Sequence, residues 1–96
     1  MPGSNEKMIG EVIREFLRTH KLEDRVTETM IMTSWEKIMG RHIARYTTRM
    51  VLRGDKLTIY LDSAVLRNEL GMAKTKIIQL IHKEIGKEFL TDISFR

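Results

Sequence analysis

Arginines recur at every fourth position through one segment of the chain, and their spacing suits the binding of a polyanion. They are Arg41, Arg45, Arg49 and Arg53, and Tyr60 follows shortly after them. Guanidinium groups bind phosphate oxygens well, and an exposed aromatic ring can stack on a nucleobase. If the segment that holds Arg49 and Arg53 is a regular strand, both side chains lie on the same face of it. The pattern therefore predicts a basic face with one aromatic residue nearby.

A second group of basic residues follows a helical period further along the chain. Lys76 and Lys83 fall on one flank of a predicted helix, and Arg67 and Lys74 fall on the other flank. Only one flank can adjoin a path that continues from the arginines, and the sequence leaves open which one. A solvated, charge-balanced surface accounts for such flanks about as well as a binding site does. The candidate nucleic-acid-binding residues are Arg45, Arg49, Arg53, Tyr60, Arg67, Lys74, Lys76 and Lys83.

Residue types that serve enzymes are present, but without the spacing that their chemistry needs. His20, His42 and His82 stand apart, so no metal site or catalytic base is indicated. Ser63 lacks the GxSxG context of a nucleophile, and its place before a helical pattern predicts an N-cap instead. No GxxxxGK[ST] or GxGxxG motif occurs. We therefore expect no catalytic activity, no cofactor, no metal and no small-molecule substrate.

The composition is typical of one small globular domain over residues 1–96, with residues 1–4 expected to be disordered. The chain is 42% hydrophobic and 31% charged, and its formal net charge of +4 favours anionic partners. The absence of cysteine fits a reducing compartment. No apolar run approaches the roughly 20 residues of a membrane span, and the first residues do not resemble a secretion signal. These features predict a cytoplasmic protein without a membrane partner.

The tripeptide Arg53-Gly54-Asp55 would suggest cell adhesion in an extracellular chain, but its neighbours predict a turn. Leu57, Ile59 and Leu61 alternate with polar residues, which is the period of a strand with one buried face. The preceding segment alternates less regularly and is rich in β-forming residues. Glycine adopts positive φ at low cost and aspartate tolerates turns. Gly54 and Asp55 are therefore expected at the tip of an antiparallel hairpin.

Helical periods account for most of the remaining chain. A first helix is expected over about residues 5–20, and a second from about Glu23, which either bends or restarts at Gly40. A third begins after Ser63 and stops near Gly86, and the closing residues predict a short strand. The predicted order is helix, helix, strand, strand, helix, strand. The expected core residues are Trp35, Leu57, Ile59, Leu61, Leu66, Leu70, Ile77 and Ile81.

This order predicts an α+β domain of two layers, with the third helix on the apolar side of a three-stranded sheet. The opposite side of the sheet is then free to face water. It is expected to carry Thr47, Arg49, Val51, Arg53, Thr58 and Tyr60.

Five features between Trp35 and Arg96 stand out together: WEKIMGRHIARYT, the hairpin LRGDKLTIYL, the segment SAVLRNELGMAKTKII, Gly86 and the closing DISFR. They resemble the DciA family of bacterial proteins, which are associated with the replicative helicase. The segment SAVLRNELGMAK is the most specific and is similar to the short single-domain branch of the family. The two N-terminal helices agree with the family in position and in little else.

The resemblance implies a fold similar to a K-homology domain, binding of single-stranded DNA, and a role in loading or operating the replicative helicase. K-homology domains usually hold the nucleic-acid backbone with a GxxG loop, which this chain lacks, so binding must use other surfaces. Two alternatives remain open. In the first, the protein is an adaptor that contacts an acidic partner without touching DNA. In the second, it is a K-homology-like module that binds RNA.

Overall fold

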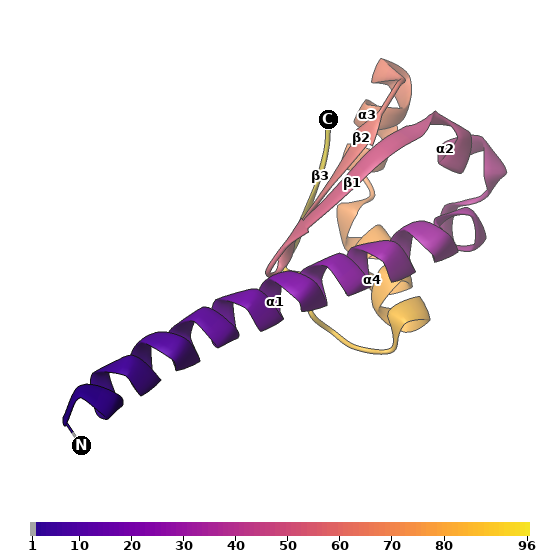
Figure 1. Ribbon diagram of the computed structural model, residues 1–96. Coiled ribbons are helices and arrows are strands. Elements are labelled where there is room, and N and C mark those ends of the chain that lie inside the picture. The colour runs from indigo at the N-terminus through magenta and orange to yellow at the C-terminus, as the bar shows by residue number, and fades with distance from the viewer. Residues whose placement is uncertain (1) are drawn as a thin grey trace.

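The computed structural model describes the backbone of residues 2–96 and the side chains of residues 10, 11 and 21–96. Its elements are α1 (Pro2–Met39), α2 (Arg41–Tyr46), β1 (Thr47–Arg53), β2 (Lys56–Leu61), α3 (Ala64–Gly71), α4 (Lys74–Ile85) and β3 (Asp92–Phe95), as Figure 1 shows. The predicted α+β class with a three-stranded sheet is confirmed. Of residues 1–4, which were expected to be disordered, residue 1 lies outside the described backbone and residues 2–4 belong to α1. The expectation stays a prediction.

The N-terminal region forms one continuous helix where two were predicted. Helix α1 runs from Pro2 to Met39, so the boundary expected between about residues 20 and 23 does not exist. The connecting sequence His20-Lys21-Leu22-Glu23 contains neither glycine nor proline, and nothing in it stops a helix. The apolar residues that predicted the first helix belong to the part of α1 whose side chains the structure does not describe.

Gly40 ends α1, and the chain restarts there as the short helix α2. Its φ of +90° lies in the region that residues with a Cβ rarely adopt. Its N–H still donates to the carbonyl of Glu36 at 2.7 Å, and its own carbonyl accepts from the N–H of Ala44 at 3.1 Å. Gly40 therefore changes the direction of the chain while both of its backbone groups stay hydrogen-bonded.

The sheet is mixed, with the strand order β1-β2-β3. Strands β1 and β2 form the predicted antiparallel hairpin, and β3 lies parallel to β2 on its other side. At the hairpin tip Gly54 has a φ of +63°, as the first central residue of a type II′ turn requires. The carbonyl of Asp55 accepts the N–H of Thr91 at 2.8 Å, so the tip also holds the segment that leads into β3.

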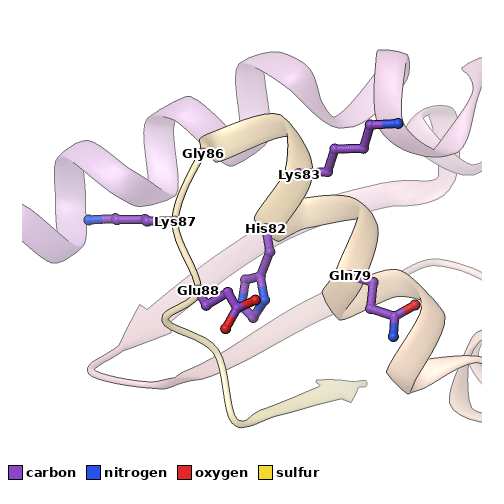
Figure 2. Close-up of a pocket in the computed structure, with 6 residues that line it drawn as sticks. All are labelled: Gln79, His82, Lys83, Gly86, Lys87 and Glu88. Carbon is purple, nitrogen blue, oxygen red and sulfur yellow. The ribbon is translucent and has the colours of Figure 1, made fainter.

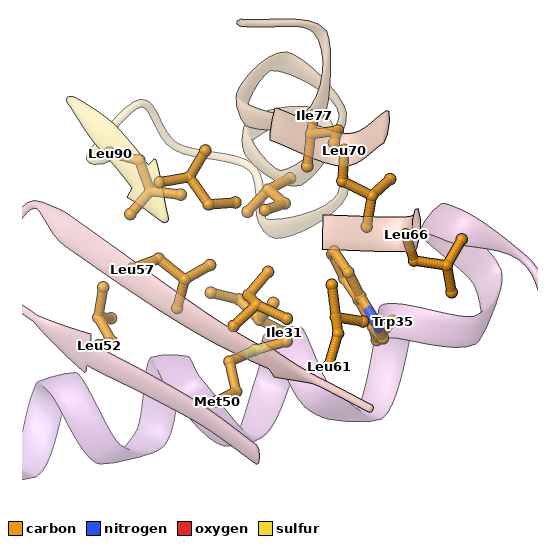
Figure 3. Close-up of a cluster of buried hydrophobic side chains, with 13 residues drawn as sticks. Ile31, Trp35, Met50, Leu52, Leu57, Leu61, Leu66, Leu70, Ile77 and Leu90 are labelled. Carbon is orange, nitrogen blue, oxygen red and sulfur yellow. The ribbon is translucent and has the colours of Figure 1, made fainter. Parts of the chain in front are cut away.

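The hydrophobic core lies between one face of the sheet and the helices (Figure 3). Strand β2 contributes its alternate residues, and the helices contribute residues from α1, α3 and α4. Burying this apolar surface is the main driving force for a domain without disulfides. The buried apolar residues are Ile31, Trp35, Met50, Leu52, Leu57, Ile59, Leu61, Leu66, Leu70, Ile77, Ile81, Leu90 and Ile93.

The third predicted helix is two helices, because the chain makes a tight turn at Met72 and Ala73. Their N–H groups donate to Glu69 and Leu70, three residues back, and α4 then begins at Lys74. Ser63 caps α3 by accepting the N–H of Leu66 at 3.2 Å. The turn interrupts the helical period, so a single apolar stripe does not continue from α3 through Leu80 of α4. Leu80 is 37% exposed.

Thr47 is not on the open face of the sheet, where the sequence placed it. The pairing of β1 with β2 shifts register between Thr47 and Arg49, which turns Thr47 toward the core side. Its Oγ1 accepts the indole N–H of Trp35 at 2.8 Å and donates to the carbonyl of Ile43 at 2.8 Å. Trp35 is 1% exposed and fills the core beside this junction.

Candidate nucleic-acid interface

The face of the sheet opposite the helices carries three cross-strand rows of side chains. Arg49, Tyr60 and Arg96 form the first row. Val51, Thr58 and Ser94 form the second, and Arg53, Lys56 and Asp92 form the third. We call these nine residues the open sheet face. Four of them are cationic and one is anionic, so the open sheet face is basic.

The first row places an aromatic ring between two arginines. Arg49 pairs with Tyr60 across β1 and β2, and its Cζ lies 5.4 Å from the centroid of the Tyr60 ring. On the other side, the N–H of Arg96 donates to Ile59 at 2.9 Å, and the carbonyl of Arg96 accepts from Leu61 at 2.8 Å. These two bonds pair Arg96 with Tyr60 in the parallel ladder. The half-buried tyrosine ring is therefore flanked by both guanidinium-bearing residues.

The cations of the open sheet face have no carboxylate partner among the described side chains. The described side chains form two ion pairs, Lys37 with Glu84 at 3.0 Å and Arg41 with Glu36 at 3.3 Å. Both pairs lie away from the open sheet face. Neighbouring rows on one face of a strand are about 6.6 Å apart, so Arg49 and Arg53 are separated by roughly 13 Å. The open sheet face thus presents separated positive charges along β1 that form no ion pair with a described side chain.

The remaining predicted basic residues do not join the open sheet face. Arg67 on α3 donates from Nη1 to the carbonyl of Leu61 at 2.6 Å, which ties it to the end of β2. Lys74 and Lys76 lie in the first turn of α4, which has no side-chain N-cap. Because α4 packs against the buried side of the sheet, its exposed residues face away from the open side. Arg45 is exposed on α2.

Lys83 lies at a hollow of about 550 Å³ near the end of α4, together with His82 and Lys87. Figure 2 shows that Lys83 and Lys87 point in opposite directions, so their charges do not converge. His82 uses Nε2 to accept the N–H of Phe89 at 3.2 Å and of Leu90 at 2.9 Å. This imidazole fastens the segment after α4, and we assign it no chemical role.

A groove of about 510 Å³ lies along α1 and the outer edge of β1 and is lined by residues of both. Its walls carry Lys21 and Arg25 from α1 and Arg49 and Arg53 from β1, so it is continuous with the open sheet face. Two carboxylates on α1 also line it. Glu28 accepts the N–H of Leu52 at 2.9 Å, and Asp24 accepts that of Gly54 at 3.0 Å.

No cluster of histidine and acidic side chains suited to a metal ion occurs within the described part of the chain. Among the described helices, none combines the length and the apolar character that a membrane crossing requires.

Comparison with known proteins places the chain in a family. A family model described as Dna[CI] antecedent, DciA, matches residues 8–95. The chain belongs to the DciA family. A UPF0232 protein of Corynebacterium glutamicum (strain R) is 24% identical over 85 residues, which cover 88% of this chain and 48% of the relative. The chain thus spans about half the length of that curated relative. No solved structure matches the chain.

Membership of the DciA family confirms the resemblance found in the sequence. It does not extend to the likeness to a K-homology domain, which stays a prediction. The sequence did not single out four basic residues that the DciA fold brings to the same side of the sheet. Lys56 follows from the same alternation in β2 that places Thr58 and Tyr60 on this face. Arg96 joins it through strand pairing, and Lys21 and Arg25 join it because α1 lies along β1, so these three follow from no local pattern.

Proposed function

We propose that the protein is a single-stranded DNA-binding accessory factor that assists the loading or operation of the replicative DNA helicase. The helicase role rests on membership of the DciA family, whose description connects it with helicase-loading proteins. The DNA-binding role rests on the open sheet face. Replicative helicases act on separated strands, so a partner that holds single-stranded DNA suits that role.

The row formed by Arg49, Tyr60 and Arg96 carries the DNA-binding part of the proposal. Proteins that bind single strands combine aromatic rings, on which bases stack, with cations that contact the backbone. Tyr60 supplies the ring, and the guanidinium of Arg49 lies over one of its faces at 5.4 Å. A base that stacks on Tyr60 uses the other face or displaces Arg49, and both arginines of the row are then neighbours of its phosphates. Arg53 and Lys56 extend the basic surface toward the hairpin tip.

Replacement of Tyr60 tests this proposal most simply. Stacking of one base on an aromatic side chain contributes about 1–3 kcal/mol, so Tyr60→Leu is expected to weaken binding of a labelled single-stranded oligonucleotide by roughly 5- to 150-fold. Tyr60→Phe keeps the ring and is the matched control, with an affinity close to wild type. Fluorescence anisotropy measures both affinities, and circular dichroism checks that the variants fold.

DNA and RNA oligonucleotides of the same sequence belong in this experiment. Contacts to the 2′-hydroxyl distinguish the two, and the protein residues alone do not reveal which sugar is preferred. Tighter binding of RNA would favour the K-homology-like RNA-binding alternative. Equal affinities of the Tyr60→Leu and Tyr60→Phe variants would remove Tyr60 from the site.

The adaptor alternative draws on a different observation. Helix α1 exposes Leu22, Val26 and Met30, which follow one another at intervals of four residues and give its solvent side an apolar stripe. Exposed apolar side chains of this kind typically mark a protein contact, because nucleic-acid surfaces are mainly charged. If the wild-type protein retains the helicase on an affinity column but binds no oligonucleotide, the adaptor function replaces the proposed one.

A further inference from the structure

We propose that the groove between α1 and β1 carries the sugar–phosphate backbone of the bound strand, with Lys21 and Arg25 as phosphate contacts. This inference rests on the proposed function and extends it, because it adds α1 to a site so far confined to the sheet. The groove is lined by Lys21, Asp24, Arg25, Glu28, Arg49 and Arg53. Lys21 and Arg25 are one helical turn apart on α1 and face the two strand arginines across it.

Charge is the first reason to assign a phosphate backbone to the groove. Four cations line it against two carboxylates, and no ion pair links these six groups among the described contacts. Arg49 belongs both to this groove and to the row that holds Tyr60. A strand whose base stacks on Tyr60 thus has a continuous basic path from the open sheet face into the groove.

The two carboxylates explain why the groove does not take a peptide strand instead. A peptide that extends a sheet must bond to the free N–H and C=O groups of the edge strand. On the outer edge of β1, the N–H of Leu52 is bonded to Glu28, and that of Gly54 to Asp24. Two N–H groups of this edge are therefore already bonded to side chains of α1, which disfavours an added peptide strand and leaves the cations as the groove's main binding groups.

The first test removes the two helix cations. Each phosphate contact contributes about 0.7 to the slope of log affinity against log salt for single strands. The double variant Lys21→Gln with Arg25→Gln is therefore expected to flatten the wild-type slope by about 1.4. Both side chains are exposed, so its melting temperature should match that of the wild type. The control variant Lys37→Gln with Lys87→Gln removes two exposed charges from the helical side and is expected to keep the wild-type slope.

The second test changes affinity in the opposite direction. Glu28→Gln keeps an oxygen that accepts the N–H of Leu52 but removes a negative charge from the groove. It is expected to tighten oligonucleotide binding by about two- to fivefold, the size of a surface charge interaction. Glu88→Gln makes the same change in net charge on the helical side and is expected to leave the affinity unchanged.

The results separate this inference from the function on which it rests. If the wild type binds oligonucleotides but the Lys21 and Arg25 variant keeps the wild-type slope, the groove is not part of the path and the inference fails alone. A slope flattened equally in the control variant indicates a general effect of net charge and also overturns it. If the wild type shows no binding, the proposed function fails and the inference fails with it.

Discussion

Trp35 shows how one side chain joins the helical layer to the sheet. Its ring fills the core, and its indole N–H donates to Thr47 at the point where α2 passes into β1. Thr47 in turn donates to the carbonyl of Ile43 on α2. This chain of hydrogen bonds links α1, α2 and β1, and it fixes the irregular start of the strand that carries Arg49 and Arg53.

Truncation of Trp35 is therefore expected to unfold much of the protein. A buried tryptophan replaced by alanine typically costs about 3–5 kcal/mol, a large share of the stability of a domain of this size. Trp35→Phe keeps most of the packing and loses the bond to Thr47, so it should cost clearly less. Urea unfolding followed by circular dichroism measures both. A Trp35→Ala variant with unchanged unfolding but no oligonucleotide binding would make Trp35 a stacking residue instead.

The period-two pattern of β1 and β2 was enough to predict that Arg49, Arg53 and Tyr60 share a face of the sheet. It failed for Thr47, because a register shift is a property of the paired strands and leaves no mark in a single one. Arg96 was missed for a similar reason. Its place beside Tyr60 depends on the parallel pairing of β3 with β2, which joins residues far apart in the sequence.

At the scale of elements, the sequence predicted strands better than helix ends. The strand signals of β1 and β2 meet at the turn residues Gly54 and Asp55, whereas α1 passes through a polar stretch with no stop signal. The break between α3 and α4 follows Gly71, yet a single glycine inside a periodic segment is compatible with a continuous helix. The continuity of α1 therefore agrees with local propensity, whereas the break after Gly71 does not follow from it.

His82 holds the connection between α4 and β3 by hydrogen bonds, and this role can be tested by substitution. Its Nε2 accepts two backbone N–H groups, those of Phe89 and of the buried Leu90. His82→Ala leaves both donors without this acceptor and is expected to destabilise the domain by about 1–3 kcal/mol. Hydrogen exchange of the Phe89 and Leu90 amides should quicken more than exchange in the hairpin.

A matched control is available on α2. His42→Ala removes an exposed imidazole that contacts only the Tyr46 ring among the described aromatic contacts, at 5.3 Å between centroids. Its effect on stability should stay within about 0.5 kcal/mol. Unchanged exchange at Phe89 and Leu90 in the His82→Ala variant would show that the imidazole does not hold this segment.

At the scale of the whole molecule, the two layers divide the basic residues into separate surfaces. The open sheet face and the adjoining groove lie on one side, and the lysines of α4 lie on the other. The open sheet face and the groove together carry six cations and three carboxylates, a formal charge of +3, so most of the net charge of +4 lies on the sheet side. A single strand of nucleic acid can follow one of these surfaces without wrapping around the domain, and we propose that it follows the sheet.

The salt dependence of oligonucleotide binding tests this assignment most directly. With three or four phosphate contacts on the open sheet face, the wild type should show a slope of log affinity against log salt of about −2 to −3 from these contacts alone, and the two contacts proposed for the groove add about −1.4. Arg49→Ala with Arg53→Ala should flatten that slope by about 1.4. Two variants on the helices, Lys76→Ala with Lys83→Ala and Arg67→Ala with Lys74→Ala, should change it less and show whether either helix flank adjoins the path. An unaltered slope in the Arg49 and Arg53 variant, or no salt-dependent binding by the wild type at micromolar concentrations, would contradict the account.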